Sequence, residues 1–148
     1  MVQFRMIHQR SSDTIERVFK ERADALKKRV AEKMADAIIE RSPVDTGTYV
    51  LAHTARPEAT EYETRSSHGR PRGRNPNQFK ALARGNLMRS VAAWPATSNE
   101  LFFRNVSAHA GRVEHLGWNG VPAYRVYADT RAEAPRYITD AARELGFT

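Results

Sequence analysis

The stretch DTIERVFKERADALKKRVAEKMADAIIER, from Asp13 to Arg41, decides the fold of this chain. Its apolar residues recur every three or four positions, which is the spacing of one face of an α-helix. They are Ile15, Val18, Phe19, Leu26, Val30, Met34, Ala37 and Ile38. Asp13 and Glu16 resemble a capping box, and Glu16 and Lys20 have the favourable i to i+4 order of charges. The stretch therefore predicts a long amphipathic helix.

The length of this helix already says something about its surroundings. At 1.5 Å per residue it would reach about 40 Å, more than the core of a domain of this size normally covers. We therefore expect part of its apolar stripe to contact another molecule.

The composition fits one domain, 1–148. A chain of 148 residues, 41% of them apolar, can bury a core that needs no disulfide or metal. It has no cysteine, which excludes disulfide frameworks, thiol nucleophiles and cysteine-rich zinc sites. No apolar run approaches the roughly twenty residues that span a bilayer, and the first residues lack the apolar core of a signal peptide. We expect a soluble, cytoplasmic chain with no cofactor and no membrane contact.

Short elements are predicted on both sides of the long helix. Val2, Phe4 and Met6 alternate with polar residues, which allows a strand before it. After it, the run SPVDTG at 42–47 predicts a sharp turn, because proline cannot continue a helix and glycine adopts positive φ without penalty. Residues 48–55 predict a strand. Residues 56–77 predict a long basic loop or arm, interrupted by proline and glycine.

The rest of the chain alternates between helical and strand periodicity. Asn75 before Pro76 predicts the start of a helix that runs to about Trp94. Further on, the pattern predicts a strand at 101–106, a short helix at 108–116 closed by Gly117, a strand at 123–127 and a final helix at 131–145. The order predicts an α+β fold, in which the long N-terminal amphipathic helix and shorter helices pack on a small, mainly antiparallel sheet.

One segment carries the whole charge excess of +7. Between Thr64 and Asn99 there is no acidic residue, whereas the remainder has seventeen residues of each sign. The basic residues inside are Arg65, Arg70, Arg72, Arg74, Lys80, Arg84 and Arg89. Such a segment meets phosphates, an acidic protein surface or only water. We expect all of these but Arg89 to contact a partner protein or DNA.

Catalytic motifs are scarce, and we expect no enzyme activity. The chain lacks a G-x-S-x-G elbow, a Gly-rich phosphate loop and an H-E-x-x-H pair. His109 and His115 lie six residues apart, which points them to nearly opposite sides of a helix, so we expect no shared metal ion.

One tripeptide leaves an enzymatic alternative open. Aspartic proteases use Asp-Thr-Gly to present a carboxylate that shares a proton with its symmetry mate, and Asp45-Thr46-Gly47 would do so in a homodimer. Those enzymes carry the tripeptide after an apolar strand in a nearly all-β chain. Here a long helix and Ser42-Pro43 precede it, which favours a structural turn.

The basic segment leaves a second alternative, a nucleic-acid-binding protein. Arg70, Arg72 and Arg74 form a guanidinium cluster suited to phosphates, and Tyr62 and His68 are able to stack on bases. Aromatic residues are few there, however, and no known reader motif is present. This favours a solvated or partner-facing loop, with non-specific contact with DNA left open.

Two motifs in order resemble a known family. The long helix ends in Ser42-Pro43-Val44-Asp45-Thr46-Gly47-Thr48-Tyr49, and FFRNVSAHA at 102–110 and VEHLGW at 113–118 follow further on. Together they resemble the neck and tail-completion family of tailed bacteriophages, the minor structural proteins that join head to tail or finish the tail tube. His109 stands where that family commonly has tyrosine, and one additional residue separates Glu114 from Gly117.

The resemblance implies a structural, non-enzymatic virion protein in the neck or tail, assembled in the host cytoplasm. It implies a homo-oligomeric ring, often hexameric, stacked between connector or neck proteins and tail-tube or terminator proteins, with channel DNA close enough for non-specific contact. Its motif residues are Pro43, Asp45, Thr46, Gly47, Asn105, Glu114 and Gly117. We interpret most of these as local turns that mark the fold.

Overall fold

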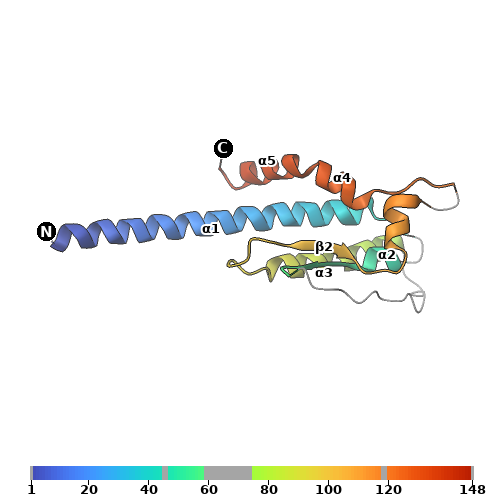
Figure 1. Ribbon diagram of the computed structural model, residues 1–148, viewed down its shortest axis with the longest axis horizontal. Coiled ribbons are helices and arrows are strands. Elements are labelled where there is room, and N and C mark those ends of the chain that lie inside the picture. Colours follow the sequence, from blue (N-terminus) through green and yellow to red (C-terminus); the bar gives the residue numbers. More distant parts are fainter. Residues whose placement is uncertain (1, 45–46, 59–74, 118–119, 148) are drawn as a thin grey trace.

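Figure 1 shows one long helix with the shorter elements arranged on its two sides. The computed structural model describes residues 2–44, 47–58, 75–117 and 120–147, and of 2–12 it describes only the backbone. The elements are α1 (Val2–Arg41), α2 (Thr48–Leu51), β1 (His53–Arg56), α3 (Pro76–Ala92), β2 (Phe102–Asn105), η1 (Arg112–Leu116), α4 (Val126–Ala132) and α5 (Ala134–Glu144). The predicted α+β class is confirmed.

Helix α1 is longer than the sequence pattern predicted. It begins at Val2, so the strand predicted at its start and the capping box at Asp13 are both wrong. No glycine or proline occurs before Pro43, and each residue added to an existing helix gains a backbone hydrogen bond without a new nucleus. The predicted end is confirmed, because α1 stops at Arg41, just before the proline.

The sheet has two antiparallel strands, as the predicted class requires. Strand β1 pairs with β2 in a register that sets His53 opposite Asn105 and Arg56 opposite Phe102. Residues 48–51, however, form the helical turn α2, so the strand predicted at 48–55 is wrong over its first half. Tyr49 and Val50 are adjacent and both buried, which a strand with alternating faces would not allow.

Helix α3 begins where the sequence predicted. The Asn75 side chain accepts a bond from the Gln78 amide at 3.0 Å, and the Gln78 side chain accepts one in return from the Asn75 amide at 3.2 Å. This reciprocal capping box satisfies two amides that no helical carbonyl reaches. Most of the loop predicted at 56–77 lies outside the described residues.

The C-terminal region differs from the prediction in two places. The predicted strand at 123–127 is wrong, since residues 122–125 have no regular structure and α4 begins at Val126. The predicted final helix is divided into α4 and α5, because Pro135 has no amide hydrogen to continue the first of them. The short helix closed by Gly117 is confirmed as η1.

The core lies where α1 passes between the two sides of the fold. Its centre is formed by fully buried residues of four elements, namely Ala35, Ile38 and Ile39 of α1, Val50 of α2, Leu87 of α3 and Val126 of α4. All of the α1 residues in this set come from the C-terminal part of the helix. In Figure 1 the N-terminal part extends beyond every other element.

Candidate functional site

The motif residues that carry the family resemblance gather at the end of the molecule opposite the start of α1. We call this region the motif end and define it as Gly47, Asn105, Glu114 and Gly117 with the turns that they close. Asp45 and Thr46 lie outside the described residues, and Pro43 lies two positions past the end of α1.

Gly47 forms the turn into α2 and lies against α3. Its φ is +79°, and a β-carbon placed there would lie 2.9 Å from the ring of Phe79. The Gly47 carbonyl accepts the amide of Leu51 at 3.0 Å, which closes the single turn of α2. The position therefore requires glycine for both its backbone angle and its contact.

Asn105 joins the end of β2 to α2. Its amide nitrogen donates to the Tyr49 carbonyl at 2.8 Å. Its side-chain oxygen accepts the backbone amide of Ser107 at 3.0 Å and the Ser107 hydroxyl at 2.6 Å. The asparagine thus holds a turn and a neighbouring element together, a role that neither aspartate nor leucine would reproduce.

Glu114 anchors α4 to η1. Its buried carboxylate accepts the amide of Tyr127 at 3.0 Å and 3.2 Å, one to each oxygen, and the amide of Ala128 at 3.0 Å. The first amides of a helix have no helical acceptor, and a carboxylate is a favourable partner for them. No local pattern in the sequence predicts this contact, because the acceptor and its helix are more than ten residues apart.

Gly117 closes η1 with a conformation that only glycine adopts readily. Its φ is +73° and its ψ is −172°. A β-carbon there would lie 2.2 Å from the backbone oxygen of Val121, a contact that no side-chain movement relieves. The four residues of the motif end therefore all have partners or constraints within the chain.

A buried polar network that the sequence did not reveal lies beside these residues. His53 of β1 contacts Ser42 through Nε2 and Tyr127 through Nδ1, each at 2.7 Å, and the amide nitrogen of Asn105 lies 3.3 Å from Nδ1. The three partners come from the end of α1, from α4 and from β2. No spacing along the chain connects them, so periodicity and motifs could not have found the network.

The hydrogen bonds define which nitrogen of His53 carries the proton. The Ser42 hydroxyl donates to the carbonyl of Ile38 at 2.6 Å, since a carbonyl can only accept. Ser42 Oγ must then accept from His53 Nε2, and the Tyr127 hydroxyl donates to Nδ1. An imidazole that already holds its proton on Nε2 cannot remove the serine proton, so the 2.7 Å pair is not an activated nucleophile and base.

Burial keeps these groups neutral. It lowers the pKa of His53 to about 3. It also raises the pKa of Tyr127 far above its usual range, with a smaller contribution from the nearby Tyr49 and Glu114. For Tyr49, burial and then the Glu114 charge raise the pKa in the same direction. The network is therefore uncharged at neutral pH.

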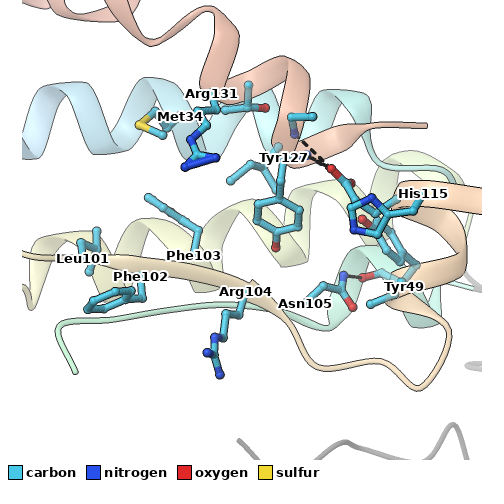
Figure 2. A pocket seen from close by; sticks show the side chains of 16 residues that line it. Met34, Tyr49, Leu101, Phe102, Phe103, Arg104, Asn105, His115, Tyr127 and Arg131 are labelled. Atoms are coloured by element: carbon cyan, nitrogen blue, oxygen red, sulfur yellow. Dashed lines mark hydrogen bonds between the residues drawn. The ribbon is translucent and has the colours of Figure 1, made fainter. Parts of the chain in front are cut away.

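A groove of about 660 Å³ lies next to this network, between β2 and the helices α1 and α4. Figure 2 shows Phe103 of β2 and Leu101, the residue before that strand, on one side, and Met34 of α1 with Arg131 of α4 on the other. The Tyr49 hydroxyl is buried at its edge and has no hydrogen-bond partner among the described residues. The lining is mainly apolar and holds one carboxylate, Glu114, which the α4 amides already occupy.

The basic residues predicted to meet a partner are divided by the structure. Arg84 Nε lies 2.7 Å from Asp36 Oδ1, and its Nη2 binds Glu40, both on α1. Lys80 donates to the Glu40 carbonyl at 2.7 Å. These two cations thus join α3 to α1, and their contact with another molecule stays a prediction. Arg65, Arg70, Arg72 and Arg74 lie outside the described residues.

The two histidines weighed as metal ligands lie in different surroundings. His109 is half-buried beside Tyr49, with ring centroids 6.3 Å apart, and His115 is exposed on η1. Among the described residues no group of three or more histidine, cysteine, aspartate or glutamate side chains is placed to hold a metal ion. None of the described helices combines the length and apolar character of a membrane span.

Comparison with known proteins identifies no relative: no family model, no curated protein and no solved structure matches the chain.

Proposed function

We propose that this chain is a structural protein of a tailed phage, a subunit that forms a ring in the neck or at the tail end and joins head to tail. Its partners are further copies of itself, often six in a ring, and the connector, neck, tail-tube or terminator proteins on either side. It acts in the virion after assembly in the host cytoplasm.

The observation that carries the proposal is the motif end. The residues behind the family resemblance come from separate parts of the sequence, yet Asn105 and Glu114 each join elements that are distant along the chain. Gly47 and Gly117 occupy positions where a β-carbon would collide with the chain. Residues with these constraints are markers of a fold, which is how we interpret most of them from the sequence, and a shared fold is what the resemblance needs.

Two further observations favour a structural role over catalysis. The Ser42–His53 pair has its proton on the wrong nitrogen for activation, and burial keeps His53 neutral. The groove beside it is mainly apolar, and its one carboxylate is occupied by backbone amides. This arrangement suits packing against another surface better than the chemistry of a small substrate.

The test is genetic. The reading frame is disrupted in the phage genome that carries it, and the lysate is examined by negative-stain electron microscopy. We expect filled heads and separate tails, with joined particles restored when the wild-type chain is supplied from a plasmid. Intact infectious particles from the disrupted phage would overturn the proposal. A plasmid that supplies Gly111→Ala, a change in open space, serves as the matched control and should restore joining.

A further inference from the structure

The part of α1 that leaves the fold carries an uncovered apolar stripe. We call residues Asp13–Ala23 the α1 arm. Every side chain of the arm is exposed. Ile15 is 57% exposed, Val18 41% and Phe19 69%, and the three lie within one turn of one another. An isolated helix gains little stability in water, and most helical stability in proteins comes from covering such a face.

The stripe continues a face of α1 that the chain itself covers further along. Ile15 precedes Lys33 by eighteen residues, which is five full turns of 3.6 residues, so both lie on the same face. Lys33 Nζ lies 2.5 Å from Glu144 Oε1 of α5. The C-terminal residues cover this face as far as Arg22, whose guanidinium lies 5.5 Å from the centre of the Phe147 ring. Beyond that point Ile15, Val18 and Phe19 are exposed in the described part of the chain.

The charges of the arm indicate what that molecule is. The arm has three acidic residues, Asp13, Glu16 and Glu21, and three basic residues, Arg17, Lys20 and Arg22, so its net charge is zero in a chain of +7. The charge excess of the chain lies between Thr64 and Asn99, so contact between two neutral arms adds no net repulsion of its own. The carboxylates also disfavour nucleic acid, whose phosphates they would repel.

The ion pairs of the arm support contact between two such helices. Lys20 binds Glu16 at 2.7 Å, and Arg17 binds Glu21 at 3.7 Å. On a helix of 100° per residue the first pair lies to one side of the stripe and the second to the other. Each edge of the stripe therefore presents both signs, which a second arm with the same pattern is able to complement.

We propose that the α1 arms of two copies pack against each other through Ile15, Val18 and Phe19. The contact is between copies of this chain, and it holds whether or not the protein joins phage heads to tails. It buries the apolar stripe and leaves the motif end of each copy accessible to other partners.

The first experiment compares masses. The wild-type chain, the variant Ile15→Ser/Phe19→Ser and the control Ile138→Ser are measured by light scattering after gel filtration. The control removes an apolar side chain of α5 that is 49% exposed, similar in character to those of the arm. We expect the wild type and the control to have at least twice the 16.8 kDa of one chain, and the arm variant to fall at least two-fold. A wild-type chain of 16.8 kDa, or an arm variant of unchanged mass, would overturn the pairing.

The second experiment does not depend on the fold tolerating two serines. The chain has no cysteine, so Val18→Cys introduces a single thiol in the stripe, and Ala81→Cys introduces one on the exposed side of α3. A disulfide needs β-carbons about 4 Å apart. Under mild oxidation we expect Val18→Cys to form a disulfide-linked dimer and Ala81→Cys to remain mostly monomeric. Equal yields from the two variants would contradict the pairing.

These results are separable from the genetic test of the proposed function. A ring that persists in Ile15→Ser/Phe19→Ser would refute arm pairing and leave the head-to-tail proposal standing. If purified Val18→Cys forms the covalent dimer but the phage assembles normally after its reading frame is disrupted, arm pairing stands and the head-to-tail proposal is refuted.

Discussion

The α1 arm and the motif end, at opposite ends of the molecule, contrast in how their side chains are satisfied. At the motif end the described turns are explained by contacts within the chain: Asn105 and Glu114 bind distant backbone, and Gly47 and Gly117 are constrained by their neighbours. In the arm the apolar side chains of Ile15 and Phe19 are more than half exposed. The comparison shows that a fold can be locally complete at one end and unfinished at the other.

Changing Gly117 to alanine should have the largest effect and would test whether the motif end is as constrained as it looks. The new β-carbon would meet the Val121 carbonyl oxygen at 2.2 Å, and the φ of +73° is unfavourable for alanine. We expect a loss of more than about 3 kcal/mol in the free energy of unfolding, measured by urea denaturation, or no soluble protein.

Gly111 supplies the matched control for this change. It lies six residues earlier, and a β-carbon there would meet nothing within 4 Å. The free energy of unfolding of Gly111→Ala should lie within about 0.5 kcal/mol of the wild-type value. If both glycines tolerated alanine equally, the contrast between the two ends would be lost.

Lowering the pH should destabilise the folded chain through His53, which lies beside the motif end. Its pKa is about 3 in the folded chain and near its ordinary value of 6.5 in the unfolded chain. Between these values the unfolded chain binds a proton that the folded chain does not, so stability is complete above about pH 6.5 and falls as the pH drops towards 3. The slope approaches about 1.4 kcal/mol per pH unit.

The slope can be separated from that of the carboxylates. Contacts with Tyr137 and Arg41 lower the pKa of Glu133, and contacts with Lys33 and Arg29 lower that of Glu144. The stability that these acids contribute is lost only below their ordinary value of 4.5. Urea titrations at pH 7, 6 and 5 should show the slope in the wild type and in His115→Gln, and not in His53→Gln. An equal slope in His53→Gln would exclude His53 as its source.

Replacing Phe19 by serine should have the smallest effect on the stability of a single chain. It tests the contrast between the motif end and the α1 arm at the arm. Because Phe19 is 69% exposed, its loss removes little packing within the chain. At high dilution we expect the free energy of unfolding of Phe19→Ser to lie within about 0.5 kcal/mol of the wild-type value. The thermal midpoint of the wild type should rise with protein concentration, and that of Phe19→Ser should not. A large loss at high dilution would show that the arm packs within its own chain.

The sequence predicted those parts of the fold whose signal is local. The periodicity of 13–41, the proline after α1 and the Asn75–Pro76 start of α3 each act over a few residues, and all three are confirmed. The failure at 48–51 arose where packing against other elements decides. Residues 48–51 have the composition of a strand, yet the Gly47 turn buries Tyr49 and Val50 together.

The site was less predictable than the fold for the same reason. Glu114 and Asn105 were singled out by resemblance alone, and their partners at Tyr127 and Tyr49 could not be named before the chain was folded. His53 was missed altogether, because its contacts come from three elements. Lys80 and Arg84 were expected to face a partner, since a charge count along the chain does not show that the carboxylates of α1 lie opposite them.

Helix α1 also has a mechanical consequence. It runs without a break from the arm to Arg41, and the next residue, Ser42, holds His53. A continuous ladder of hydrogen bonds is stiff along its axis, and no proline or glycine interrupts it to act as a hinge. A pull or twist applied to the arm should therefore reach the end of α1 and the contact between Ser42 and His53.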